Sequence, residues 1–257
     1  MGEVSEKVKV INRPLRLAAV LVGDSKASRK FLDLKKVATE KIGVSFKQYE
    51  FKEMIKTDEL CDEIVKISED ESNSGVLVEL PLPTHIDFQK VLDCIPSEKD
   101  VDVLSQSAQW AYLSGESKIL PPAVETVKVI FEKYNIDIRD KNCAVFGYGF
   151  LVGRPVSHWL TRQGVNVLII DEFTKSPEQL SKQADIIISG VGQPNLIKAE
   201  MVKEGVIVID FGPDVDFENV SKKTSLITPP TGVVGPIVIS AVLKNLILLI
   251  QGASLDK

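Results

Sequence analysis

Short β-branched and aliphatic runs alternate with longer helical patterns along this 257-residue chain. Leu15–Val22 is an apolar run that ends at Gly23, and an amphipathic segment, Ser28–Ile42, follows it with Ser28 near its start. This alternation is typical of βα units, in which helices connect parallel strands. We therefore expect an α/β fold with a mainly parallel sheet.

The pattern restarts after Pro121-Pro122, which we interpret as a domain boundary. Further strands are expected at Phe46–Phe51, Gly75–Leu80, Asn142–Phe146, Asn166–Asp171, Asp185–Val191, Val206–Phe211 and Ser225–Thr228. Further helices are expected at Thr57–Ser68 with Thr57 as N-cap, Phe88–Cys94, Ala123–Tyr134, Val152–Gln163, Ser176–Ala184 and about Gly235–Gln251. The last helix is long and apolar enough to cross back onto the first domain.

Charge and cysteine content argue against several classes of protein. A net charge of -5 and a pI near 5.3 do not suit a partner such as nucleic acid or an anionic membrane, whose binders are basic. The cysteines are widely spaced without a CxxC pair, so we expect neither a disulfide framework nor a metal site. The charged N-terminus does not resemble a signal peptide, and polar residues interrupt the last apolar run, so the expected location is cytoplasmic.

Glu79 stands at the end of an apolar run within Ser74–Pro83. Open α/β sheets bind ligands beyond the carboxyl ends of their strands, so this carboxylate is a candidate functional group. Its candidate partner is Lys35, because Ser28, Phe31 and Lys35 are spaced i, i+3, i+7 and share one helical face. A lysine there can act as an acid, a base or an electrostatic anchor, although a lone lysine is more often a solvated surface charge.

A glycine-rich stretch, Gly147-Tyr148-Gly149-Phe150-Leu151-Val152-Gly153, lies directly after an expected strand and opens a helix. Glycines at such a turn let the backbone approach a phosphate, and the helix N-terminus supplies free N–H groups. The spacing is GxGxxxG rather than GxGxxG. A second interpretation, in which the glycines only permit a tight turn, therefore stays open.

Asp171 and Glu172 end the next strand. An acid there commonly accepts hydrogen bonds from the adenosine ribose hydroxyls of NAD, and it should repel the 2′-phosphate of NADP. The alternative is that both acids merely face water. The segment Lys99-Asp100-Val101-Asp102 is, on pattern alone, an acidic loop.

Several blocks of sequence stand in the order of a known family. They are VGDSKASRKFLDLKK, GVLVELPLP, IPSEKDVD, GYGFLVGRP, ADIIISGVGQP, VIDFG and TPPTGVVGP, and together they span about Leu15 to Asn245. On these motifs the chain resembles the bifunctional methylenetetrahydrofolate dehydrogenase/methenyltetrahydrofolate cyclohydrolase family.

The resemblance implies two domains around a cleft. A catalytic folate-binding α/β domain would comprise residues 1–120 and be completed by 236–257, and a Rossmann-like NAD(P)-binding domain would comprise 121–235. The implied enzyme passes a hydride from 5,10-methylenetetrahydrofolate to NAD(P)+ and then hydrolyses the methenyl product to 10-formyltetrahydrofolate, without a metal. A tetrahydrofolate derivative is then the ligand, and a homodimer is the expected assembly.

The resemblance also assigns site residues. Lys35 and Glu79 would be catalytic, and the substrate-binding residues would be Phe31, Asp102 and Pro236. The cofactor-binding residues would be Gly147, Tyr148, Gly149, Val152, Gly153, Asp171, Glu172, Gly192, Gly232 and Gly235. In that family the loop matched by Gly232 to Pro236 lies where folate and nicotinamide meet.

Two departures from the family pattern bear on catalysis. The family tyrosine is Phe31, which keeps a stacking ring without its hydroxyl. The family glutamine is Glu79, and a carboxylate favours the ammonium form of Lys35, which makes the lysine a poorer base. Hydride transfer needs mainly orientation, so we expect the dehydrogenase step to survive a change that weakens the cyclohydrolase.

Other departures lie elsewhere in the motifs. The Arg-Ser pair that commonly serves 2′-phosphate recognition is Tyr148-Gly149, so NAD is favoured over NADP. Val103 and Val233 replace glycines, Ala108 to Trp110 replace an asparagine-glycine stretch, and the N-terminal helix is expected to be short or missing. Two alternatives stay open: a catalytically silent relative that binds folate or nucleotide as a regulatory or partner subunit, and an α/β dehydrogenase for a non-folate substrate.

Overall fold

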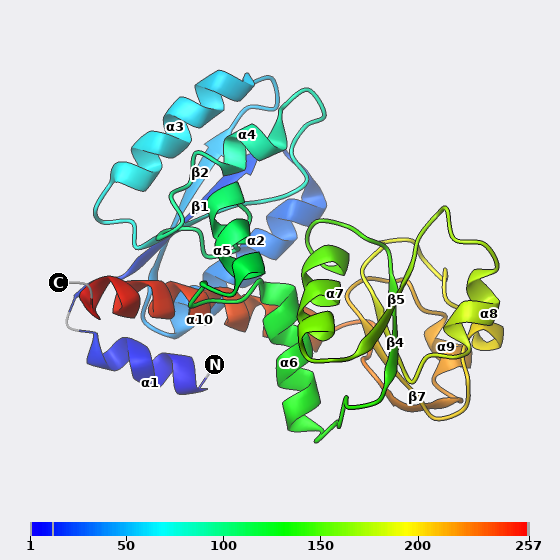
Figure 1. Cartoon of the computed structure of the whole chain (residues 1–257). Coiled ribbons are helices and arrows are strands. Elements are labelled where there is room, and N and C mark those ends of the chain that lie inside the picture. Colours follow the sequence, from blue (N-terminus) through cyan, green and yellow to red (C-terminus); the bar gives the residue numbers. More distant parts are fainter. Residues whose placement is uncertain (1, 12, 256–257) are drawn as a thin grey trace. The chain divides into compact units, whose positions relative to one another are not determined.

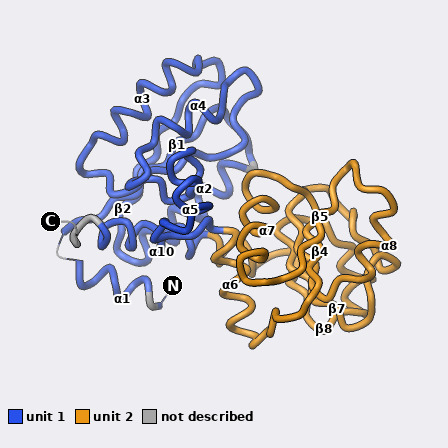
Figure 2. Tube along the Cα trace, viewed as in Figure 1, with its two compact units in different colours: residues 1–122, 239–257 blue, residues 123–238 orange. Residues whose placement is uncertain are grey.

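The computed structural model describes residues 2–11 and 13–255 (Figure 1). The chain divides into two compact units, which Figure 2 distinguishes by colour. Unit 1 consists of Met1–Pro122 and Ile239–Lys257, and unit 2 of Ala123–Val238. The boundaries expected from the sequence, 120/121 and 235/236, lie beside these limits. Each unit has a parallel sheet with helices, which confirms the expected α/β fold class.

Unit 1 is built on a three-stranded parallel sheet in the order β2-β1-β3. Its strands are β1 (Arg16–Val22), β2 (Ser45–Phe51) and β3 (Gly75–Val78), and its helices include α1 (Gly2–Val10), α2 (Lys26–Lys41), α3 (Thr57–Glu69), α4 (Phe88–Leu92) and α5 (Gln106–Ser114). The central strand β1 is buried at nearly every residue, whereas the edge strand β2 alternates between exposed and half-buried residues. The carboxyl ends of β1 and β3 meet at one edge of this sheet.

The last helix, α10 (Val234–Leu255), completes unit 1 from Ile239 onward. By length and composition alone it could cross a membrane. Its apolar side chains pack instead into the core of unit 1, to which it contributes Ile239, Val242, Leu243, Leu246, Ile247 and Ile250. The buried Asn245 on this helix donates hydrogen bonds from Nδ2 to Val101 O at 2.9 Å and Leu120 O at 2.8 Å.

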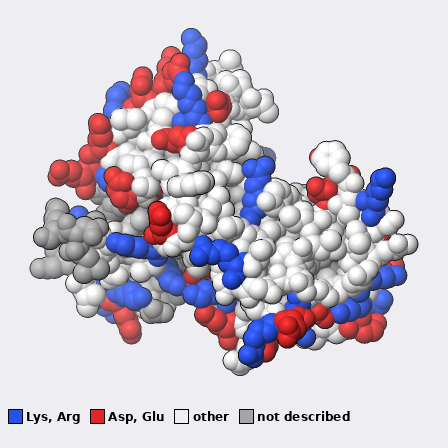
Figure 3. All heavy atoms as spheres, in the orientation of Figure 1, with Lys and Arg blue, Asp and Glu red and all other residues white. Residues whose placement is uncertain are grey.

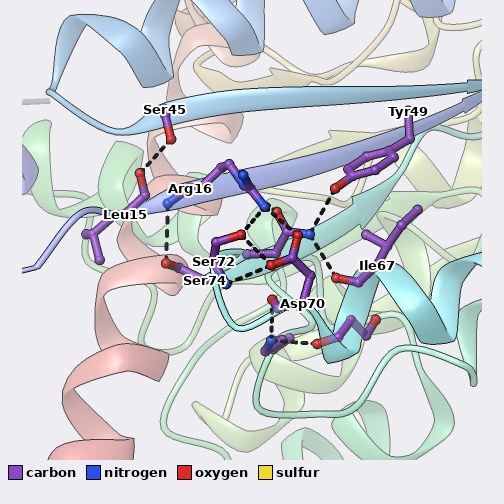
Figure 4. Close-up of polar contacts among 11 residues, drawn as sticks. Leu15, Arg16, Ser45, Tyr49, Ile67, Asp70, Ser72 and Ser74 are labelled. Carbon is purple, nitrogen blue, oxygen red and sulfur yellow. Dashed lines mark hydrogen bonds and ion pairs between the residues drawn. The ribbon is translucent and has the colours of Figure 1, made fainter.

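A polar cluster ties the amino end of β1 to the loop before β3 (Figure 4). Arg16 donates from Nε to Asn73 Oδ1 and from Nη2 to Asp70 Oδ2, each at 2.6 Å. Asn73 is buried and donates in turn to Tyr49 Oη at 3.2 Å and Ile67 O at 2.8 Å. Three segments of unit 1 are thereby joined at the end of the sheet opposite Glu79.

The structure corrects several expectations for unit 1. The N-terminal helix is not missing, because α1 forms over nine residues and its Val4 is buried in the core. Its apolar residues are few and β-branched, which is a weak helical signal. Helix α2 begins at Lys26 rather than at Ser28, and Ser25 is its N-cap. Thr57 is the first residue of α3 rather than its N-cap, and its Oγ1 accepts a hydrogen bond from Asp87 N.

Unit 2 is built on a five-stranded parallel sheet in the order β5-β4-β6-β7-β8. The strands are β4 (Asn142–Phe146), β5 (Asn166–Ile170), β6 (Ile186–Ser189), β7 (Val206–Asp210) and β8 (Thr224–Ile227). The helices are α6 (Pro122–Lys133), α7 (Gly153–Arg162), α8 (Pro177–Ser181), the 3₁₀ helix η1 (Ala199–Met201) and α9 (Phe217–Val220). Strand order reverses between β4 and β6, and open sheets bind ligands at such a switch point.

Figure 3 shows charged side chains of both signs scattered over one face of the molecule, between uncharged areas. On the face that Figure 3 shows, lysine and arginine side chains lie beside aspartate and glutamate side chains over both units. The functional site has to be located from individual contacts instead.

Candidate functional site

Lys35 and Glu79 meet at the carboxyl edge of the unit 1 sheet. Lys35 lies in the middle of α2, and Glu79 directly follows β3, where its N–H donates to Val20 O of β1 at 2.9 Å. The Lys35 Nζ donates to Glu79 Oε1 at 2.5 Å. Both side chains are largely buried, with 13% and 7% of their surfaces exposed. The pairing inferred from the sequence pattern is thus present as a short, charge-assisted hydrogen bond.

Asp102 belongs to the same group of charges. The pKa of Asp102 is raised to about 6, mainly by burial, against the lowering effect of the Lys35 charge and with smaller raising contributions from Asp100 and Glu79. The carboxylates of Asp102 and Glu79 and the ammonium group of Lys35 therefore act on one another electrostatically. A protonated Asp102 can donate a hydrogen bond, whereas the ionised form can only accept, so this group can hold a proton near neutral pH.

The buried Asp100 carboxylate organises the loop that carries Asp102. It accepts hydrogen bonds from Asp102 N at 3.2 Å, Leu104 N at 2.8 Å, Ser105 N at 2.7 Å and Ser105 Oγ at 2.8 Å. Burial raises the pKa of Asp100 against the lowering effect of these bonds. Within this loop Val103 adopts φ 59°, a conformation that favours glycine, the residue that the family has at this position.

Phe31 lies one turn before Lys35 on α2, and half of its surface is exposed. Residues spaced i, i+4 lie on the same side of a helix, so an apolar ring stands beside the ammonium group. Ser28, from the same predicted face, is buried. Unit 1 therefore combines an exposed aromatic surface, a buried ion pair and a carboxylate that can carry a proton. Such a set can bind a flat heterocycle and move protons at it.

The glycine turn of unit 2 is closely packed against its own backbone. Gly147 has φ 79°, and a Cβ atom at Gly153 would lie 2.1 Å from Gly147 O. The N-terminus of α7 therefore approaches β4 so closely that only glycine fits at Gly153. Gly149 has no atom within 4 Å of a Cβ position. The space at Gly149 is open and lies at the N-terminal end of α7, where Arg154 N donates to Gly149 O at 3.0 Å, so a phosphate has room there.

The loop after β6 closes the other side of this turn. A Cβ atom at Gly190 would lie 2.6 Å from Val152 Cβ, and a Cβ atom at Gly147 would lie 3.0 Å from Val191 Cγ2. Gly192, two residues beyond Gly190, has φ 81°. The two loops thus form the walls of the switch point between β4 and β6, which is the place where a dinucleotide fits this fold.

The acids after β5 differ in their bonding. Asp171 Oδ1 accepts hydrogen bonds from Phe173 N at 3.1 Å and Thr174 Oγ1 at 2.9 Å, so this carboxylate also shapes the turn. Glu172 is exposed. At the glycine turn, Tyr148 is half exposed, and the Arg154 guanidinium lies 5.7 Å from its ring and donates from Nε to its carbonyl.

The predicted glycine loop near the C-terminus lies at the start of α10. Gly232 has φ 84°, and Gly235 and Pro236 occupy the first turn of the helix, which begins at Val234. These residues belong to unit 2, whereas Phe31, Lys35, Glu79 and Asp102 belong to unit 1. No cluster of three or more metal-ligating side chains is found among residues 2–11 and 13–255.

Three residues of the site were given no functional role in the sequence predictions. Gly190 could have been found, because it directly follows an apolar strand that the sequence shows plainly. Asp100 and the buried Asp214 make their contacts mainly to backbone N–H groups of loops. Loop conformation is not visible as periodicity, so the sequence pattern holds no signal for either residue.

Comparison with known families gives matches along both units. Residues 1–102 match the family model described as tetrahydrofolate dehydrogenase/cyclohydrolase, catalytic domain. Residues 121–254 match the corresponding model described as the NAD(P)-binding domain. Together the two matches extend over most of the chain.

Individual relatives are similar over nearly their whole length. A protein of Hydrogenobaculum sp. named bifunctional protein FolD is 38% identical over 253 residues, which cover 94% of this chain and 91% of that protein. The crystal structure of the bifunctional enzyme FolD, methylenetetrahydrofolate dehydrogenase/cyclohydrolase, from Campylobacter jejuni superposes with a TM-score of 0.93 at 37% identity, covering 98% of this chain and 94% of that one. The Trypanosoma brucei methylenetetrahydrofolate dehydrogenase-cyclohydrolase, complexed with NADP and inhibitor, gives a TM-score of 0.93 at 28% identity with the same coverage.

Proposed function

The chain belongs to the tetrahydrofolate dehydrogenase/cyclohydrolase family, and on that premise we propose that it oxidises 5,10-methylenetetrahydrofolate to 5,10-methenyltetrahydrofolate with a nicotinamide dinucleotide. The family resemblance expected from the motifs is confirmed. The observation that carries the proposal for this chain is the buried Lys35–Glu79 pair beside Asp102, at the strand ends where the fold places a ligand. The proposal of a silent relative is not favoured.

The residues of unit 2 fit a dinucleotide. Glycine is required at Gly153 and Gly190 by the close approach of the backbone and of Val152, and the space at Gly149 is open. The pyrophosphate would lie in the open space at Gly149, at the positive end of the α7 dipole. The bound dinucleotide supplies the hydride acceptor. These residues orient it and cover its phosphates.

We propose that NAD is preferred to NADP. Asp171 and Glu172 follow β5 next to the glycine turn, because Gly147 N donates to Ile170 O at 2.8 Å. A 2′-phosphate there would face two carboxylates, and like charges ~4 Å apart repel by about 4 kcal/mol at an effective dielectric near 20. The Arg154 guanidinium lies near this turn, and its Nε donates to the Tyr148 carbonyl.

In unit 1 the proposed roles follow from contacts and charges. Phe31 stacks on the pterin ring, and Asp102 binds its polar edge. Lys35 Nζ donates a short hydrogen bond to the Glu79 carboxylate, so this amine is engaged by Glu79 and is poorly placed to accept a proton. Hydride transfer depends on orientation and electrostatics, whereas hydrolysis also needs proton transfer from water. We therefore propose that the hydrolysis to 10-formyltetrahydrofolate is slower in this chain than the oxidation.

The test is a turnover assay with purified protein. Substrate is supplied with NAD+ or with NADP+, and methenyl product is followed by its absorbance. Lys35→Met should lower hydrolysis by about 10²-fold or more, while Lys36→Met, which changes the neighbouring exposed lysine, should leave it unchanged. Absence of methenyl product with both dinucleotides would refute the proposed oxidation.

The cofactor preference needs a binding measurement of its own. Titration calorimetry should give a lower Kd for NAD+ than for NADP+. In Glu172→Gln the ratio of the two Kd values should be smaller than in the unchanged protein. Tighter binding of NADP+ by the unchanged protein would contradict the role of the two acids. The homodimer and the cytoplasmic location expected from the sequence stay predictions, which sedimentation and cell fractionation can test.

A further inference from the structure

Two buried carboxylates stand at the carboxyl edge of the unit 2 sheet. Asp210 is the last residue of β7 and is 7% exposed, and Asp214 follows it in the next loop and is fully buried. Burial raises the pKa of Asp210 to about 6. The hydrogen bond from Gly212 N opposes this rise, and the charge of Asp214 adds to it. Buried charge is costly, so its placement beside the cofactor crevice calls for a role.

Asp210 holds the segment that carries Asp214. Its Oδ1 accepts from Gly212 N at 2.9 Å, and its Oδ2 accepts from Val215 N at 3.1 Å. A Cβ atom at Gly212 would lie 3.1 Å from Asp214 Oδ1, so the chain passes close to that carboxylate. The bonds to Asp210 and the close approach of Gly212 therefore fix the position of Asp214.

Asp214 directs one oxygen at the loop after β6. Its Oδ2 accepts from Ser189 Oγ at 2.6 Å and from Val191 N at 2.7 Å. Its Oδ1 is buried and, among the described residues, has no hydrogen-bond partner. Both bonds are short, and their donors lie on the segment from 189 to 191.

That segment is the wall of the crevice opposite the glycine turn. Val191 contacts the Cβ position of Gly147, and Gly190 admits the Val152 side chain. A shift of the Val191 backbone would therefore either open the crevice or press on the turn. Because protein interiors are close-packed, such a shift is transmitted rather than absorbed.

We propose that Asp214 is a positioning residue for dinucleotide binding, which it serves by holding the loop from Ser189 to Gly192 against the glycine turn. The inference rests on the proposed function, because it assigns that crevice to the dinucleotide. It concerns binding at unit 2 and requires nothing of Lys35 or Glu79.

The proposed role requires a hydrogen-bond acceptor oxygen at position 214 and does not require a negative charge there. Asparagine keeps an acceptor of the same shape, whereas leucine keeps the volume and removes both hydrogen bonds. Asp185 offers a matched control, because it lies at the opposite end of β6 and accepts from Asn142 N at 2.9 Å and Lys203 Nζ at 2.6 Å. It is a carboxylate bonded to backbone and side chain, but distant from the crevice along the strand.

The experiment measures NAD+ affinity by titration calorimetry for the full chain and its variants. Asp214→Leu should raise the Kd for NAD+ by about 10-fold or more, because two strong bonds are lost and their donors are left buried. Asp214→Asn should stay within about 3-fold of the unchanged protein, and Asp185→Leu within about 2-fold. The affinity for tetrahydrofolate should be unchanged in all variants.

Ser189→Ala serves where Asp214→Leu does not fold, since it removes one donor and leaves the carboxylate, and it should raise the Kd for NAD+ by about 3-fold. Unchanged NAD+ affinity in Asp214→Leu or Ser189→Ala would overturn the inference. An equal loss of tetrahydrofolate affinity, or an equal effect of Asp185→Leu, would overturn it as well, because either marks a general loss of structure. Dinucleotide binding without turnover in the unchanged protein would refute the dehydrogenase proposal alone.

Discussion

Lys35 on α2 and Glu79 at the end of β3 form a buried ion pair, with 2.5 Å between Nζ and Oε1. The family motif has a neutral glutamine at the position of Glu79. An amide can accept from the lysine without compensating its charge, whereas a carboxylate compensates it fully. This one exchange places an ion pair in the middle of the folate-binding unit and biases the site against proton abstraction by lysine.

The Lys35–Glu79 ion pair should contribute measurably to the free energy of unfolding. Lys35→Met leaves the Glu79 carboxylate buried without its partner, so the free energy of unfolding should fall by about 3 kcal/mol. The double variant Lys35→Met with Glu79→Gln removes both charges and should recover most of this loss. Urea unfolding of the four proteins at pH 7 measures the coupling. Purely additive effects would show that the two groups do not interact energetically.

Asp102 should make stability depend on pH. Burial raises its pKa to about 6, so the folded protein binds this proton more tightly than the unfolded chain. The ionised group therefore lowers stability above pH about 6, and this cost disappears as the group protonates toward pH 4. Asp102→Asn should raise the free energy of unfolding at pH 7 by at most about 3 kcal/mol, with little difference at pH 4. A larger gain at pH 4 than at pH 7 would contradict the raised pKa.

The glycine turn offers a matched pair of substitutions. Gly153→Ala places a methyl group 2.1 Å from Gly147 O, so it should lower the free energy of unfolding by more than about 2 kcal/mol and weaken NAD+ binding. Gly149→Ala meets no atom within 4 Å and should fold normally. Thermal unfolding compares the stability of the two variants, and titration calorimetry compares their affinity for NAD+. Equal stability of both variants would mean that the close approach of α7 to β4 is not required.

Much of the architecture was predictable from the sequence because each element carries its own signal. The buried parallel strands are apolar runs, and the Lys35 and Glu79 partnership follows from a helical face and a strand end that the βα order brings to one edge. The glycine turn is equally local, since its strand, turn and helix are contiguous.

The parts that were not predictable depend on loops and on weak amphipathicity. Helix α1 contains few apolar residues, and α5 is framed by Ser105 as N-cap and Gly115 with φ 87° rather than by a clear apolar stripe. Asp100 and Asp214 bind backbone N–H groups whose positions only the folded loops define. A carboxylate with such partners looks in sequence like any surface acid.

The measurement that tests the central claim most directly is the ratio of hydrolysis to oxidation in Glu79→Gln. Removing the carboxylate frees Lys35 from its ion pair and should make it a better proton acceptor, while the orientation of the substrate for hydride transfer is retained. Methenyl formation with NAD+ and the subsequent loss of methenyl absorbance are followed in one assay for both proteins. We predict that the ratio rises by about 10-fold in Glu79→Gln. An unchanged or lower ratio would contradict the account of the Lys35 and Glu79 pair.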